Sequence, residues 1–214
     1  SRLAEGLARR GHAVLALAAS DRGPAYLAED GGLRVHRLRS FHNPFRVGQR
    51  FVAWPAGSLR AALDAFQPDV VHSHDPTGVG LAALQTAWAA GVPPLLTLHQ
   101  LPWFVPASLP AWAAGPARPL EGLAWVYYRW LGRRVRQLIT PSRAIADIVR
   151  AHAAGDPLAI SNGVDLERFN PASPAPDEAA TLRRKYGLDP QLPIILHVGG
   201  FCGRRAQRLP GAAS

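Results

Sequence analysis

Two histidines, a serine and an asparagine are the residues of this sequence best placed to do chemistry: His74, His99, Ser142 and Asn162. They come just after, or at the end of, the largely apolar stretches 69–73, 95–98, 137–140 and 158–161. Imidazole, hydroxyl and amide groups brought together would supply the donors and acceptors that a hydroxyl-rich ligand needs. We interpret all four as candidate ligand-binding groups. His99 is the strongest, because neither a helix cap nor a turn requires imidazole.

Several of these positions also have an ordinary structural explanation. Ser142 is a suitable N-cap for a following helix, and Asn162-Gly163 is a typical tight turn. Asp75-Pro76, directly after His74, is a typical turn start. Both interpretations stay open at this point.

Two further motifs suggest other chemistry. His72 and His74 lie on one face of a strand and, with Asp75 and His99, could ligate a divalent metal, although a core position explains His72 better. The stretch 78–83 matches the G-x-G-x-x-A dinucleotide fingerprint, but no acid occurs between Pro76 and Leu120 to bind a ribose. A serine-hydrolase elbow and a P-loop are both absent from the sequence.

Alternating helical and strand patterns must position these residues. We predict helices at 3–10, 58–66, 78–90, 120–136 and 142–152, and strands at 13–19, around 35, and at 69–73, 95–98, 137–140 and 158–161. Such alternation is typical of an α/β fold, here a Rossmann-like parallel sheet with helices on both faces. Residues 13–19 are apolar throughout, which predicts a strand covered on both faces.

The chain of 214 residues accommodates one large domain but not two complete α/β domains. We expect the first domain at 1–169, a linker and the beginning of a second domain at 170–200, and a basic tail at 201–214. A short polar helix ending near Tyr186 and a strand at 193–198 are predicted within the middle segment. The chain starts at Ser1 and has no methionine, so we expect a fragment or a processed chain.

Composition narrows the class of protein. No apolar run is long enough for a membrane span, and the single cysteine excludes an internal disulfide framework, which fits a reducing, cytoplasmic location. The net charge is +9. Residues 34–60 combine six arginines with four large aromatic residues and no acid, so we expect peripheral contact with an anionic membrane and no nucleic-acid partner. A solvated face with core-facing aromatic residues is the alternative for this segment.

Five segments in order resemble retaining glycosyltransferases of family 4. They are Leu3–Val14, Pro68–His74 (PDVVHSH), Leu96–His99 (LTLH), Ile139–Ser142 (ITPS) and Ile160–Phe169 (ISNGVDLERF). The resemblance covers about residues 3–199 and implies the N-terminal, acceptor-side domain of the GT-B fold, lacking its first strand.

The resemblance also implies a reaction, namely transfer of a sugar, of hexosyltransferase type, from a nucleotide-sugar donor to an acceptor hydroxyl with retention. No metal or other cofactor is implied. His99 would lie against the transferred sugar as the catalytic residue, and His74, Ser142, Asn162 and Gly163 would bind substrate. The segment 34–60, together with Trp103-Phe104 after His99, suggests that the acceptor, lipid-linked or a small molecule, is met at the inner face of the membrane.

The family's donor-side features are not recognisable in this sequence. After Gly199 the expected Arg and Lys-Gly that hold the diphosphate do not follow at the matching spacing, and the E-x7-E segment is missing. We therefore predict that this polypeptide alone transfers no sugar. A non-catalytic sugar- or nucleotide-binding module remains an alternative, as does a metal-dependent hydrolase built on His72, His74 and His99.

Overall fold

The computed structural model describes residues 2–30, 32–42, 50–52, 54–102, 118–167, 169–170, 176–189 and 192–193. The chain divides into two compact units, 1–163 and 164–214. The predicted strand at 193–198 (apart from Pro193) and the tail at 201–214 lie outside the described residues.

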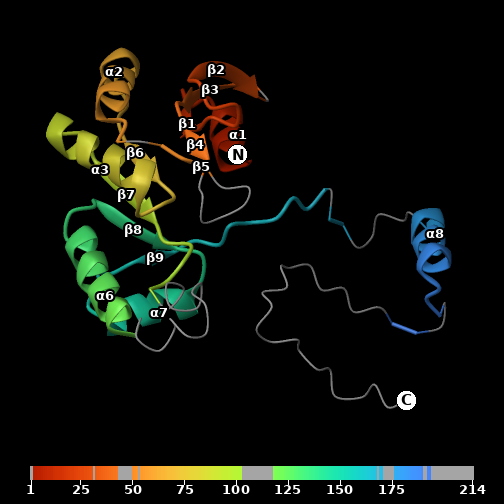
Figure 1. Cartoon of the computed structure of the whole chain (residues 1–214). Helices are drawn as coiled ribbons and strands as arrows, with labels where there is room; N and C mark the ends of the chain where they lie inside the picture. The colour runs from red at the N-terminus through yellow and green to blue at the C-terminus, as the bar shows by residue number, and fades with distance from the viewer. Residues whose placement is uncertain are drawn as a thin grey trace. The chain divides into compact units, whose positions relative to one another are not determined.

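A four-stranded parallel sheet forms the centre of the first unit (Figure 1). Its strands, in spatial order, are β6 (Val71–Ser73), β7 (Pro94–Thr97), β8 (Gln137–Thr140) and β9 (Leu158–Ala159). The connecting helices are α3 (Gly78–Ala90), α6 (Arg118–Gly132) and α7 (Arg143–Ala151). Sequential parallel strands joined by helices confirm the predicted Rossmann-like architecture, because such strands can be connected only by crossovers.

One core cluster joins this sheet to its three connecting helices. Leu96 of β7 and Leu138 of β8 pack with Leu84 of α3, Trp125 of α6 and Val149 of α7. All five side chains are almost completely buried. This apolar layer fixes the helices on the sheet and thereby fixes where each strand ends.

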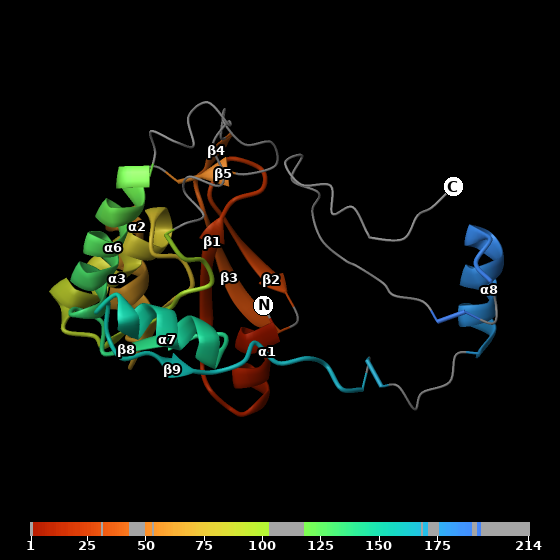
Figure 2. The same ribbon diagram turned by 90° about the horizontal axis from the view of Figure 1, so that it is seen from below.

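A second sheet has the order β1 (Leu15–Ala19), β3 (Leu33–Leu38), β2 (Tyr26–Asp30) (Figure 2). The strand predicted around residue 35 is therefore confirmed as β3, which pairs parallel with β1. The sequence analysis missed β2, which is antiparallel to β3. Its Ala, Glu and Asp residues have low strand propensity, so pairing with β3 rather than local preference makes it a strand.

The prediction that residues 13–19 form a strand covered on both faces is wrong. All five residues of β1 are only partly buried. In the described structure β1 pairs with β3 and has no other strand partner, so it is an edge strand. The preceding helix α1 (Arg2–Arg9) is strongly amphipathic but has no buried residue.

Smaller elements complete the described chain. The strands β4 (Phe41–His42) and β5 (Arg50–Phe51) pair antiparallel, and α2 (Ala56–Phe66) packs beside α3 (Figure 1). In the second unit, α8 (Pro176–Tyr186) is the predicted polar helix.

Two glycines of α6 have opposite surroundings. A Cβ atom at Gly132 would overlap the carbonyl oxygen of Ala154, whereas a Cβ at Gly122 would meet nothing within 4 Å. Gly132 therefore allows α6 to approach the chain that follows α7, and Gly122 has no such role. The helix ends at Gly132 rather than at the predicted residue 136.

We expect Gly132→Ala to destabilise the protein by about 1–3 kcal/mol, because backbone must move to accommodate the methyl group. Gly122→Ala is the matched control within the same helix and should stabilise by about 0.5–1 kcal/mol, since alanine has the higher helix propensity. Urea unfolding followed by circular dichroism measures both. Equal effects of the two substitutions would contradict the packing role of Gly132.

Candidate functional site

The parallel register brings the chain segments after β6 and β7 to the same edge of the sheet. His72 is paired with Leu95, and Ser73 with Leu96. Because side chains alternate along a strand, His72 and Thr97 lie on the face opposite Leu96, away from the helical core cluster. The Nε2 atom of His72 lies 2.8 Å from the Thr97 hydroxyl oxygen, which confirms that they share this face.

His74 and His99 are brought into direct contact at this edge. Nδ1 of His74 lies 3.0 Å from Nε2 of His99, and the two rings stack with centroids 5.4 Å apart. The ring of His72 lies 4.3 Å from that of His74, again between centroids. His72 and His74 thus form one row with His99, which lies 25 residues beyond His74 in sequence. His74 and His99 are exposed at its outer end.

Burial and mutual repulsion keep the inner part of this row uncharged. Desolvation is the largest cause, with the neighbouring His74 and His99 as smaller ones, of a pKa of His72 lowered to about 4. Burial, with His99 as a second cause, also lowers the pKa of His74. His72 and His74 therefore offer neutral hydrogen-bonding groups near neutral pH.

Two tyrosines that the sequence analysis did not select hold the segments that carry these histidines. Tyr127 of α6 donates a hydrogen bond to the carbonyl of Pro76, and Tyr128 donates one to the carbonyl of Gln100 at 3.2 Å. Burial raises the pKa of each hydroxyl to about 12, so both remain donors. In sequence they look like core aromatic residues of a helix, and only the fold shows that their hydroxyl groups reach these loops.

The other predicted site residues follow the neighbouring strands. Ser142 is exposed and caps α7, because its hydroxyl accepts a hydrogen bond from the amide of Ile145 at 3.3 Å. Asn162 and Gly163 are exposed after β9, and Gly163 has φ +72°, as a tight turn requires. The parallel order of the strands places these residues at the same carboxyl edge as the histidines. Among the predicted site residues, however, the structure shows a direct side-chain contact only between His74 and His99.

The residues around the glycine-rich stretch have structural roles. The carboxylate of Asp75 accepts hydrogen bonds from the amide and hydroxyl of Thr77, which confirms the turn interpretation. A Cβ at Gly80 would overlap the carbonyl oxygen of Asp75 and crowd the Ser73 hydroxyl. Gly80 thus permits close packing of α3 on β6, which explains this glycine without a bound dinucleotide.

The geometry gives no support to the metal-dependent alternative. Across the described parts of the chain, no three His, Cys, Asp or Glu side chains are grouped so that they could hold a metal ion. His74 and His99 each have one ring nitrogen engaged with the other histidine.

Every helix within the described ranges is too short or too polar to traverse a lipid bilayer.

Comparison with known proteins agrees with the fold and with the motifs. The sequence profile of Glycosyltransferase Family 4 matches residues 1–168, and the chain belongs to this family. A GDP-mannose-dependent alpha-mannosyltransferase of Mycobacterium tuberculosis is 31% identical over 218 residues, with 98% of this chain and 53% of the relative covered. A protein of the same description from Mycolicibacterium smegmatis is 32% identical, with coverage of 96% and 51%. An alpha-maltose-1-phosphate synthase of the same bacterium is 30% identical over 70% of this chain and 41% of its own length.

This chain spans about half the length of the two mannosyltransferases. The family assignment confirms the resemblance drawn from the five ordered segments. The described first unit thus corresponds to part of a glycosyltransferase, and the activity of a whole enzyme is a matter for proposal.

The lowered pKa of His72 predicts a loss of stability in acid. Between the ordinary pKa of about 6.5 and the folded value of about 4, the unfolded chain binds more protons, so stability falls as pH drops through this window. After a discount for the partial exposure of His72, the expected loss in the free energy of unfolding at pH 5, relative to pH 7, is about 1 kcal/mol. His72→Gln should remove this part of the pH dependence, measured as the difference between urea midpoints at about pH 7 and about pH 5.

The same substitution at His12, an exposed residue outside the sheet, controls for loss of an imidazole. An unchanged difference between the two pH values in His72→Gln would show that His72 does not resist protonation in the folded protein.

Proposed function

We propose that the protein to which this chain belongs transfers a sugar from a nucleotide-sugar donor to an acceptor hydroxyl, with retention of configuration and without a bound metal. The observation that carries this proposal is the position of His99 beside His74 at the carboxyl edge of a family 4 sheet. Ligands of open α/β sheets bind outside this edge. Imidazoles there can orient sugar hydroxyls by hydrogen bonds.

His99 is the proposed catalytic residue in this scheme, positioned against the transferred sugar. A fixed hydrogen-bonding group at that point stabilises the transition state only if its orientation is set before the substrate arrives. His74, Ser142, Asn162 and Gly163 are the proposed substrate-binding residues along the same edge. Their exposure leaves them accessible to a ligand.

The proposed donor is GDP-mannose. Two of the relatives that cover almost the whole chain are described as GDP-mannose-dependent mannosyltransferases, which supports this choice. Because the chain spans about half of each relative, we propose that it transfers no sugar by itself and needs the remaining half for donor binding.

A complementation assay tests the proposed reaction. The full chain, incubated with GDP-mannose and a membrane extract as acceptor source, should give no product above an enzyme-free control. A chimera should transfer mannose when this chain is joined to the part of the M. smegmatis mannosyltransferase that the chain does not match. In this chimera His99→Ala should reduce turnover by about 100-fold or more.

His12→Ala is the matched control, because His12 is exposed and lies before β1 rather than at the carboxyl edge. Binding of sugar or nucleotide by a folded chimera without any turnover would favour the non-catalytic binding module. Turnover by the unmodified chain would overturn its proposed dependence on a second half.

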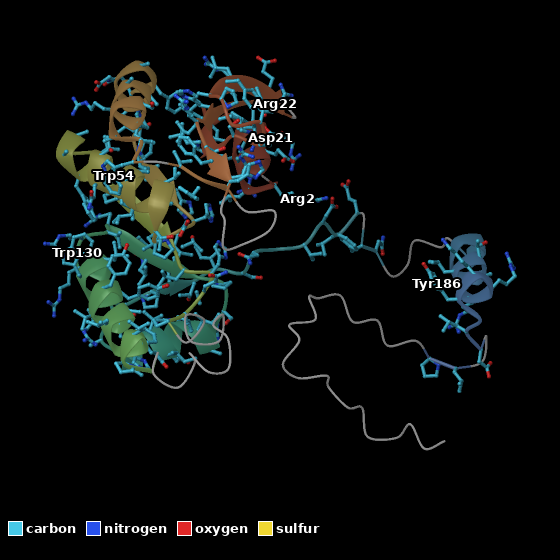
Figure 3. The ribbon with its side chains drawn as sticks, in the orientation of Figure 1. Arg2, Asp21, Arg22, Trp54, Trp130 and Tyr186 are labelled. Carbon is cyan, nitrogen blue, oxygen red and sulfur yellow. The ribbon has the colours of Figure 1, made fainter. Side chains whose placement is uncertain are left out.

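We further propose that the acceptor is lipid-linked and that the protein works at the inner, cytoplasmic face of the membrane. The side chains of Phe41, Phe51 and Trp54 are 43%, 49% and 57% exposed, enough to enter a headgroup layer. The two phenylalanine rings lie 6.3 Å apart across the β4–β5 pair, and the guanidinium of Arg39 lies over Phe41 at 5.7 Å. Trp54 follows β5 and precedes α2 in the chain, and its side chain lies beside α3 (Figure 3).

Liposome flotation tests this surface. The chain should float with vesicles rich in anionic lipid and not with neutral vesicles, because arginine and aromatic side chains act together at such a surface. The double substitution Phe41→Ser and Phe51→Ser should reduce flotation severalfold, whereas Leu123→Ser, at an exposed leucine of α6, should leave it unchanged. Equal flotation with both kinds of vesicle would contradict an electrostatic contribution.

A further inference from the structure

The contact between His74 and His99 restricts where their protons can be. A nitrogen–nitrogen separation of 3.0 Å is a hydrogen bond, which requires one hydrogen between Nδ1 of His74 and Nε2 of His99. If both nitrogens carried hydrogen, the two N–H groups would face each other. If neither did, two lone pairs would meet. One ring must therefore donate and the other accept.

This restriction reaches the second nitrogen of His99. When Nε2 of a neutral His99 donates to His74, its Nδ1 has a lone pair and can only accept. When Nε2 accepts from His74, Nδ1 carries the hydrogen and can only donate. The hydrogen-bonding role that His99 offers to a ligand is thus coupled to the proton on His74.

The surroundings of the pair strengthen this coupling. His72, whose ring contacts His74, bonds to Thr97 and is kept uncharged by burial. The Asp75 carboxylate, the acid nearest in sequence, is engaged by Thr77. Within the described residues, the three rings have no carboxylate hydrogen-bonded to them that would favour protonation of the row as a whole.

Neighbouring groups on α6 act on the backbone instead of on the rings. Tyr127 and Tyr128 donate to the carbonyls of Pro76 and Gln100, close in sequence to His74 and His99 respectively. These bonds fix the two segments, whereas the ring of His99 is oriented by His74. Backbone placement and ring orientation therefore have separate sources.

We propose that His74 is a positioning residue that fixes the ring orientation of His99 and couples the tautomer of His99 to its own, so that the role of Nδ1 of His99 toward a substrate hydroxyl follows the tautomer of His74. That the ligand is a sugar hydroxyl rests on the proposed function, but the tautomer coupling does not. This role of His74 is additional to the substrate contact proposed for it above. A role confined to folding would not couple the two tautomers.

Long-range proton–nitrogen NMR correlations on the full chain, labelled with ¹⁵N-histidine, test this proposal without any turnover. In the unmodified chain the neutral forms of His74 and His99 should show matching tautomer populations, because an accepting Nδ1 of His74 requires Nε2–H on both rings and a donating Nδ1 requires Nδ1–H on both. His74→Ala should change the tautomer ratio of His99 toward that of the exposed His12, because the coupled partner is lost. His74→Asn should also change this ratio, because its amide can present either its nitrogen or its oxygen to His99.

His12→Gln is the control and should leave the His99 signals unchanged. The proposal is overturned if His74→Ala leaves the tautomer ratio of His99 unchanged, or if His74 and His99 of the unmodified chain show different tautomer populations. Circular dichroism of each variant establishes that it is folded, and His74→Asn is measured in place of His74→Ala if the alanine variant does not fold. Since no sugar is present, failure here is distinguishable from failure of the transfer assay.

Discussion

Parallel pairing of β6, β7, β8 and β9 in their order along the chain is the constraint on which the site depends. Sequential parallel strands end at the same edge, so residues that follow them converge although they are far apart in sequence. The register of β6 against β7 then determines which residues share a face. It places His72 with Thr97 on one side and Leu96 on the other, where the helices pack. Any slip by one residue would exchange the imidazoles for core leucines.

Close packing on the helical side supports the polar side. Gly80 and Gly132 allow α3 and α6 to approach neighbouring backbone more closely than any other residue would permit. Tyr127 and Tyr128, projecting from the buried part of α6, then reach the carbonyls of the two loops at the edge. The positions of the histidines are thus set from the apolar core outward. The rigidity of this edge therefore comes from the close packing of the core beneath it.

The chemistry of the edge fits the family to which the chain belongs. Recognition of a sugar depends on directional hydrogen bonds from groups with defined donor and acceptor roles, more than on charge. A row of imidazoles whose inner members resist protonation provides such groups. The edge strand β1, by contrast, is apolar yet only partly buried, and among the described residues it is paired with a strand on one side alone.

The sequence by itself determined most helices and the parallel strands, because their hydrophobic periodicity and their turn residues act locally. The ordered motifs also led to the right family. Prediction from the sequence failed where distant segments interact. The strand β2 forms through its pairing with β3, which its own residues do not indicate. The apolar residues of β1 do not reveal how many strands flank it. The candidate positions His74 and His99 could be chosen because each follows a strand, but their hydrogen bond, and the support from Tyr127 and Tyr128, exist only once the sheet and α6 have packed. Local patterns encode elements, whereas contacts between side chains many residues apart are decided by register and packing.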